Sequence, residues 1–453
     1  MANTAAVSIS PASTSPVSAS AFRRYVRELR AFTGHAIASG GLPLSGVEVA
    51  SAHLDGRAGR ELRASVELDY LRSVGAFFTG ESIASRALAL VDDRALEGRV
   101  VDPACGCGDL LLAAAKRFPM RGTLEQTLRE WGERLIGVDT EPEFVVVARE
   151  RIALLAMIRG ARSDGQALDL SALMPGLKVA DGRSPELLRR SSAVLLNPPY
   201  GQVRAPLQCA FTSGRTTAAA LWLHDIVESG PRGVEVVAVL PDVLRSGSRY
   251  ARWRAAIAAQ ARVLDVRPEG QFDALTDVDV FLLRLRLSGG STGGWPADIA
   301  DGPALGSICA VSTGPVVDRR DPHTGPEVPY LTTRELPAAG DYRVQRTRRF
   351  GKRLFKPPFV VVRRTSRPVV GAPRLRPVVI LGTEDVAVEN HLLVLQPDDG
   401  GLAACRSLAH ALVEPAVSAW LDRRMRCRHV TVAALREIPL EHLQRKRNVA
   451  THP

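Results

Sequence analysis

Residues 191–201 read SSAVLLNPPYG, an apolar run that ends abruptly in an amide, two prolines and a tyrosine. Proline fixes its own φ and cannot donate to a sheet ladder, and the residue before a proline avoids the helical region. These restraints predict a strand over 193–196 that ends in a stiff corner at Asn197-Pro198-Pro199-Tyr200. Ligands of open α/β sheets bind at the carboxyl ends of the strands. The amide and the ring therefore indicate a pocket for a flat polar group.

The surrounding residues 76–287 alternate between strand-like and helical patterns. This alternation predicts a doubly wound parallel α/β sheet with helices over 109–118 and 141–158. The strand-like runs, in chain order, are RVVDPA, RLIGVD, LKVAD, AVLLN, VEVVAVLP and VFLLRLRL.

A turn containing two glycines follows the first of these strands, in VVDPACGCGDLLLAA at 100–114. Gly106 and Gly108 let the backbone turn tightly and let a ligand approach the main chain. The turn is not GxGxxG, and the absence of a following Lys-Ser/Thr excludes a phosphate-binding P-loop. An ordinary structural turn explains the glycines equally well.

Three successive strands end in an acid, at Asp102, Asp139 and Asp181. A single acid in such a place is more often a helix cap, but an acid after the second strand commonly holds ribose hydroxyls in nucleoside-binding sheets. Because the carboxyl ends of parallel strands meet at one edge, the three acids and the NPPY corner are expected to line one crevice.

In this order the motifs resemble those of amino-group DNA methyltransferases that use S-adenosylmethionine, in the gamma-class arrangement. The segments that carry the resemblance are GAFFTGESIASRALAL (75–90), VVDPACGCGD, GVDTEPEFVVVAR, KVADG and LLNPPYG, and it covers about 75–287. More loosely, KPPFVVVRR, ENHLLVLQPDDG and LREIPLEHL resemble recognition domains of this class and of type I modification systems. The resemblance implies a Rossmann-like catalytic domain, a small N-terminal helical segment and a mixed α+β target-recognition domain.

The resemblance also implies a role in S-adenosylmethionine binding for several residues. Thr79 would contact the methionine end, Asp139 the ribose hydroxyls and Asp181 the adenine amino group. The amino-acid portion would be held by Asp102 and by the turn that contains Ala104, Gly106 and Gly108, and Asn197 would border the cofactor. Two positions depart from the family's pattern: Gly80 stands where proline is usual, and Gly182 stands where a bulky apolar residue often packs on the adenine.

The NPPY corner suits methylation of a conjugated amine, whose delocalised lone pair makes it a poor nucleophile. Acceptors aimed at its N–H bonds, here the Asn197 side-chain oxygen and the Pro198 carbonyl, favour a tetrahedral nitrogen. Tyr200 would stack on a base that has flipped out of the duplex. By resemblance Phe272 is a second aromatic wall, although a core role for this residue fits equally well.

The net charge is +11, and +9 of it lies within 301–453. Residues 341–376 contain 12 basic side chains against one acid, which favours a nucleic-acid partner over an ordinary solvated basic face. The candidate phosphate contacts are Arg343, Arg346, Arg348, Arg349, Lys352 and Arg353, and the candidates for reading guanine edges are Arg363, Arg364 and Arg367.

The six cysteines form no CxxC pair and lie beside no histidine cluster, which disfavours a metal site and fits a cytoplasmic protein. No apolar run is long enough to span a membrane. The predicted organisation is a disordered tail at 1–20, helices at 21–75, the catalytic domain at 76–287, a linker at 288–300 and a basic recognition domain at 301–453.

These patterns predict an N6-adenine methyltransferase of double-stranded DNA. The predicted setting is restriction-modification or a related phage defence, with a separately encoded endonuclease or specificity subunit as a partner. Methylation of cytosine N4, of adenine in RNA or of a release-factor glutamine uses a similarly planar amine or amide and stays open. So does the reading of a non-catalytic DNA-binding subunit.

Overall fold

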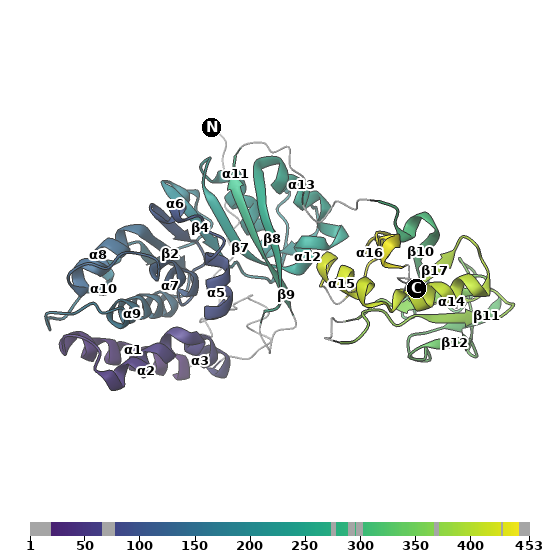
Figure 1. Ribbon diagram of the computed structural model, residues 1–453, viewed down its shortest axis with the longest axis horizontal. Helices are drawn as coiled ribbons and strands as arrows, with labels where there is room; N and C mark the ends of the chain where they lie inside the picture. Colours follow the sequence, from purple (N-terminus) through teal and green to yellow (C-terminus); the bar gives the residue numbers. More distant parts are fainter. Residues whose placement is uncertain are drawn as a thin grey trace, which may run out of the picture. The chain divides into compact units, whose positions relative to one another are not determined.

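The computed structural model describes residues 20–65, 78–272, 278–288, 295, 302–366, 371–426 and 429–443. The chain packs as two compact units (Figure 1). The first comprises residues 1–240, 256–267 and 282–293, and the second comprises 241–255, 268–281 and 294–453. Residues 1–19 of the predicted tail at 1–20, and also Arg367, lie outside the described residues, and Ser20 begins helix α1.

The first unit opens with three helices, α1 (Ser20–Ala38), α2 (Leu44–Ala52) and α3 (Ala58–Ser65). The apolar face of α1 buries Phe22, Tyr25 and Leu29. Phe22 meets Phe144 of α9 (Pro142–Ile158) edge-on, with 5.7 Å between the ring centroids. Helices therefore occupy the described part of the predicted N-terminal helical segment, and the apolar face of α1 packs on α9 of the same unit. Residues 66–75 of that prediction lie outside the described residues.

A seven-stranded sheet forms the centre of the fold, in the order β3-β2-β1-β4-β7-β9-β8. The first five strands are parallel, with register pairs such as Val101↔Ile136 and Leu195↔Val237. The order reverses between β1 and β4, which is the switch point where open sheets bind ligands. The strands are β1 (Arg99–Asp102), β2 (Leu135–Asp139), β3 (Leu177–Val179), β4 (Ser191–Leu196), β7 (Glu235–Pro241), β8 (Ala261–Gln271) and β9 (Asp279–Leu287).

Helices separate these strands along the chain, as the alternating pattern predicts. The helix after β1, α7, buries all seven of its residues, and a capping box of Thr123 and Gln126 starts α8. A short hairpin of β5 (Gln202–Arg204) and β6 (Arg215–Thr217) follows the NPPY corner. The helices are α5 (Gly80–Leu88), α6 (Asp93–Leu96), α7 (Asp109–Ala115), α8 (Leu124–Arg134), α10 (Leu170–Leu173), α11 (Ala218–Ser229), α12 (Asp242–Ser246) and α13 (Ala251–Gln260).

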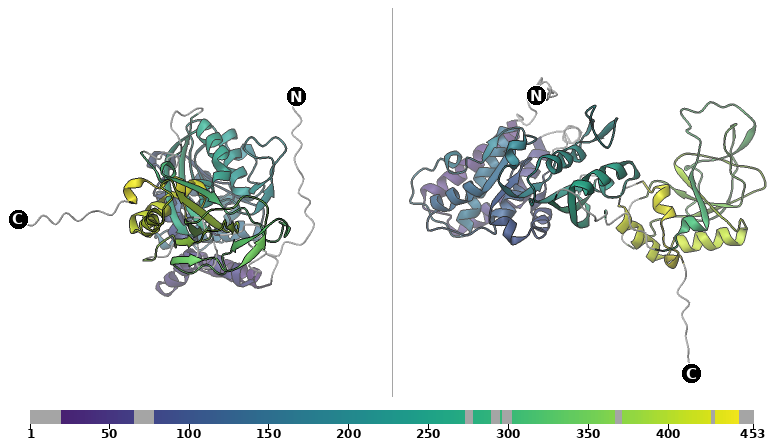
Figure 2. Two further views of the ribbon diagram at one scale, coloured as in Figure 1. Left: turned by 90° about the vertical axis from the view of Figure 1, so that its right-hand side faces the viewer. Right: turned by 90° about the horizontal axis from the view of Figure 1, so that it is seen from above.

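The second unit is mixed α+β, as predicted, and its residues beyond 301 are drawn in green and yellow in Figure 2. Along β14, Phe359 and Val361 pack into one apolar cluster while Val360 and Val362 pack into another. This sheet is therefore buried on both faces. Its strands are β10 (Cys309–Thr313), β17 (Leu392–Pro397), β14 (Phe359–Arg363), β15 (Val378–Leu381) and β12 (Gly340–Arg343).

The remaining elements of the second unit are a three-stranded sheet and three helices. The small sheet contains β13 (Thr347–Arg349), β11 (Glu327–Leu331) and β16 (Ala387–Val388), and the helices are α14 (Leu402–Leu412), α15 (Pro415–Arg424) and α16 (Val432–Arg436). Trp295, inside the predicted linker, is buried and meets Trp253 edge-on at 5.8 Å between ring centroids. This residue of the predicted linker therefore packs within the second unit.

Within the described ranges, no helix is both long and apolar enough to cross a membrane. The same ranges contain no cluster of three or more His, Cys, Asp or Glu side chains that could hold a metal ion.

Candidate active site

The acids that end β1 and β2 organise the glycine turn between β1 and α7. Asp102 Oδ1 accepts the Ala104 N–H at 3.1 Å, and Asp139 Oδ2 accepts the Gly106 N–H at 3.0 Å. The turn passes through φ of 49° at Gly106 and 86° at Gly108, a region that favours glycine. The acids thus fix this loop. A Cβ would lie 2.9 Å from the Phe78 ring at Gly106 and 3.0 Å from the Ala148 Cβ at Gly108, so both glycines also let the loop pack closely against its neighbours.

Burial without a cationic partner disfavours the ionised form of these carboxylates. Asp102 is 1% exposed, and burial raises its pKa to about 8, although the Ala104 N–H opposes the shift. Burial also raises the pKa of Asp139, against the Glu141 and Gly106 N–H groups. No basic side chain of the described residues forms an ion pair with either acid. A ligand that brings an ammonium group or hydroxyl donors would relieve this desolvation.

Asp181, the third acid, is exposed, and Oδ1 accepts the Arg183 N–H at 3.0 Å. The Arg183 guanidinium pairs with Asp225 of α11 at 3.1 Å, which ties that helix to the end of β3. A Cβ built on Gly182 would lie 1.6 Å from the Pro103 carbonyl oxygen and 3.0 Å from the Trp222 ring. Gly182 is therefore required by packing, and the Trp222 ring lies close to it. Nothing in the local sequence pattern of Trp222 indicates this position.

At the NPPY corner, hydrogen bonds orient the Asn197 amide. Its Nδ2 donates to Thr79 Oγ1 at 2.9 Å, and the Tyr200 hydroxyl lies 2.9 Å from Asn197 Oδ1 and 3.1 Å from the Val239 carbonyl oxygen. Thr217 Oγ1 donates to the Tyr200 carbonyl oxygen at 2.9 Å. Burial raises the pKa of Tyr200 well above its usual value, so the hydroxyl stays a donor. The structure thus brings Thr79 and Asn197, 118 residues apart, into direct contact.

A buried arginine connects the N-terminal helices to this corner. Arg151 of α9 is fully buried, pairs with Asp109 at 2.9 Å and donates to the His53 and Leu54 carbonyl oxygens, each at 2.9 Å. Asp109 in turn accepts the Gly80 N–H at 2.9 Å, and Gly80 has φ of 70°. Proline could supply neither this N–H nor this φ. The departure from the family's pattern at Gly80 therefore has a local structural reason.

The cysteines of the glycine turn are structural. Cys105 and Cys107 are buried, and burial raises the pKa of both thiols well above the usual value. A thiol in this state is a poor nucleophile.

Phe272 is also buried, and its N–H donates to the Val278 carbonyl oxygen at 2.9 Å within the second unit. Its role as an aromatic wall stays a prediction.

One of the predicted phosphate contacts needs correction. Arg348 is 3% exposed, and its guanidinium bonds with Asp318 and with the Asp321 carbonyl oxygen. The alternating pattern of β13 turns this side chain inward, so it serves the interior of the second unit. The other five predicted contacts are exposed: Arg343, Arg346, Arg349, Lys352 and Arg353.

Some of these exposed cations have protein partners. Lys352 pairs with Asp321 at 2.8 Å, Arg346 lies 3.6 Å from Glu335, and Arg353 lies over the Phe355 ring. Arg363 and Arg364, the candidates for base reading, are partly buried at the end of β14. The Arg363 guanidinium donates to backbone carbonyl oxygens, among them that of Leu336.

Comparison with known proteins identifies similar solved structures. The type IIL restriction-modification enzyme MmeI, solved in complex with DNA, matches with a TM-score of 0.50 at 11% identity, over 84% of this chain and 70% of that chain. The M protein of the type I restriction enzyme EcoKI matches with a TM-score of 0.35 at 13% identity, over 59% of this chain and 63% of that chain. No protein-family model matches, and no match to a curated protein sequence was found.

The match to MmeI covers both units and shows a shared fold. Together with the strand order, it confirms the predicted Rossmann-like methyltransferase fold with a mixed α+β unit after it. A chain of a type I restriction-modification system also matches, with a TM-score of 0.37 at 19% identity, over 55% of this chain and 49% of that one. The chain thus spans about half the length of that relative.

Proposed function

We propose that this protein is a DNA methyltransferase that uses S-adenosylmethionine and acts on the N6 amino group of a flipped-out adenine. The observation that carries the proposal is the Asn197 amide, held between Thr79 and Tyr200 at the carboxyl end of β4. It stands at the switch point of the sheet, beside the acids of β1 and β2. An amide oxygen accepts two hydrogen bonds, so Asn197 Oδ1 can accept a substrate N–H as well as the Tyr200 hydroxyl.

The buried acids fit the cofactor by their chemistry. Asp102, 1% exposed and without an ion pair, would receive the α-ammonium group, and the main chain of the glycine turn would border the same end. Asp139 would accept the ribose hydroxyls, and Asp181 the adenine amino group. Trp222 would pack on the adenine and so take the role of the bulky apolar residue whose position Gly182 occupies. Thr79 accepts from Asn197 and can still donate its O–H to the methionine carboxylate.

S-adenosylmethionine, when bound, supplies an electrophilic methyl group. The chain's own residues prepare the amine. Asn197 Oδ1 and the Pro198 carbonyl oxygen accept hydrogen bonds from its two N–H groups. These bonds favour a tetrahedral nitrogen, whose lone pair is exposed. Methylation turns the nitrogen into an acidic ammonium group, which then loses one proton to solvent. Tyr200 would hold the base plane, with its hydroxyl anchored near Val239. No charged base is needed at this position.

The basic second unit supports DNA over the glutamine of a release factor, because +9 of the net charge lies within 301–453. Asn in the NPPY position favours adenine over cytosine. The proposed setting is restriction-modification, with a separately encoded endonuclease or specificity subunit as a partner.

The test has two parts. Calorimetry should detect S-adenosylmethionine binding to the wild type and weaker binding to Asp139→Asn. Mass spectrometry of nucleosides from treated, unmethylated DNA should then show N6-methyladenine, and none with Asn197→Ala. N4-methylcytosine as the product would refute the adenine assignment. Failure of the wild type to bind the cofactor would refute the proposal as a whole.

A further inference from the structure

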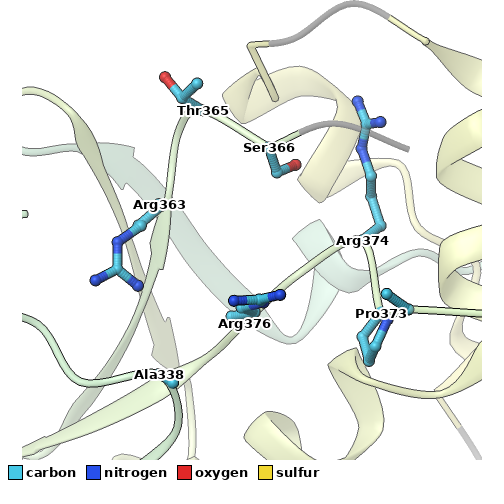
Figure 3. Close-up of a pocket in the computed structure, with 8 residues that line it drawn as sticks. Ala338, Arg363, Thr365, Ser366, Pro373, Arg374 and Arg376 are labelled. Carbon is cyan, nitrogen blue, oxygen red and sulfur yellow. The ribbon is translucent and has the colours of Figure 1, made fainter. Parts of the chain in front are cut away.

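A pocket of about 390 Å³ opens in the second unit, between the end of β14 and the approach to β15. These strands are antiparallel neighbours, with Val361 opposite Val378, so the two segments are held together by the sheet. Figure 3 shows Arg363 on one side of the pocket and Arg374 on the other, with Ser366 and Arg376 between them. The lining is Ala338, Arg363, Thr365, Ser366, Ala372, Pro373, Arg374 and Arg376.

Among the described residues, this lining contains three guanidinium groups and no carboxylate. Arg363 donates to the carbonyl oxygens of Leu336, Thr333 and Pro337, which fixes its position. Arg374 is 2% exposed and lies 3.4 Å from Asp422 of α15. Arg376 is exposed, and no described side chain forms an ion pair with it. Arg363 therefore supplies fixed positive charge, Arg374 shares its charge with Asp422, and the exposed Arg376 can meet a ligand.

Two hydroxyl groups complete the lining. Thr365 Oγ1 lies 3.2 Å from His429 Nδ1. Ser366 Oγ is buried and has no hydrogen-bond partner within the part of the chain that the structure describes. A buried hydroxyl without a partner costs free energy, which an acceptor oxygen in the pocket would recover. The pocket thus offers donors and positive charge to one small anion.

We propose that this pocket binds a phosphodiester group of the DNA backbone, an inference that rests on the proposed function. Hydroxyls, guanidinium groups and local positive charge are the usual phosphate contacts. A guanine edge would require a bidentate arginine fork, but the Arg363 fork is occupied by carbonyl oxygens and Arg374 faces Asp422. Arg376 and Ser366 extend the candidate DNA contacts beyond those that the sequence indicates, whereas the buried Arg374 lines the pocket without reaching solvent.

The test is the salt dependence of duplex binding, measured by fluorescence anisotropy on the full chain without cofactor. One phosphate contact contributes about 0.9 to the slope of log K against log salt. Arg376→Gln should therefore lower the slope by about 0.9 and weaken binding about eightfold at 0.1 M salt. The loss should be equal on duplexes of unrelated sequence. The matched control is Arg319→Gln, which removes an exposed arginine outside the pocket and should leave the slope unchanged.

Ser366→Ala, which removes only the hydroxyl, should weaken binding equally on all duplexes while keeping the slope. An unchanged slope in Arg376→Gln, or a loss confined to one DNA sequence, would overturn the assignment. Calorimetry with inorganic phosphate covers the other source of this anion. Phosphate binding that is lost in Arg376→Gln, while duplex binding stays intact, would also overturn it.

Methylation of DNA by the wild type, measured beside the DNA binding of Arg376→Gln, separates the two proposals. If the wild type methylates DNA and the variant binds DNA as the wild type does, only the pocket assignment fails. If the wild type neither binds nor methylates DNA, the proposed function fails and the pocket assignment fails with it.

Discussion

Asp102→Asn should make the first unit more stable at neutral and alkaline pH while weakening cofactor binding. Asp102 is 1% exposed, and burial raises its pKa to about 8 from a usual value of 3.8. The folded protein therefore holds a proton on Asp102 that the unfolded chain has already lost. Its unfolding free energy falls as pH rises from about 4 to about 8, and then stays level.

The size of the effect follows from the two pKa values, which differ by about 4. One pKa unit corresponds to about 1.4 kcal/mol, so the ionised carboxylate costs the folded state about 5 to 6 kcal/mol above pH 8. Asn carries no charge and can still accept the Ala104 N–H. The unfolding free energy of the variant, relative to that of the wild type, should therefore rise by about 3 kcal/mol between pH 5 and pH 7.

Urea unfolding of both proteins at pH 5, 6, 7 and 9, followed by circular dichroism, measures this difference. Asp181→Asn is the matched control, because Asp181 is exposed at the end of the neighbouring strand β3. The unfolding free energy of this control should match that of the wild type at every pH. A difference in unfolding free energy between Asp102→Asn and the wild type that does not change with pH would show that Asp102 is not protonated in the folded protein.

Three further changes probe the site. Thr79→Val removes the acceptor for Asn197 and should lower kcat about tenfold, with recovery in Thr79→Ser, measured by steady-state methyl transfer. Gly182→Ala places a Cβ 1.6 Å from the Pro103 carbonyl oxygen and should cost about 3 kcal/mol, seen as a lower urea midpoint. Trp222→Ala should weaken S-adenosylmethionine binding about tenfold and abolish any cofactor-induced change in tryptophan fluorescence. Wild-type behaviour in any of the three would contradict the corresponding contact.

The sheet was predictable because its determinants are local. Apolar runs ending in Asp102, Asp139 and Asn197 give both the strands and the edge at which their polar ends gather. Proline geometry places the NPPY corner in the same way. The second unit was predictable only as a class, because its strands pair across long loops whose register the residue pattern does not specify.

The contacts missed by sequence reasoning depend on tertiary packing. Trp222 of α11 lies close to Gly182, and the pair between Arg183 and Asp225 joins the same helix to the same segment. Thr79 meets Asn197 across 118 residues. Arg348 resembled its exposed neighbours in a basic run, yet the alternation of a three-residue strand turned it inward. Charge counts cannot distinguish these environments.

The most direct test of the central claim is methyl transfer from labelled S-adenosylmethionine, offered side by side to unmethylated duplex DNA, total RNA and release factors. The account predicts label in DNA alone, as N6-methyladenine, and none with Asn197→Ala although that variant still binds the cofactor. Label in RNA or protein but not in DNA would contradict it.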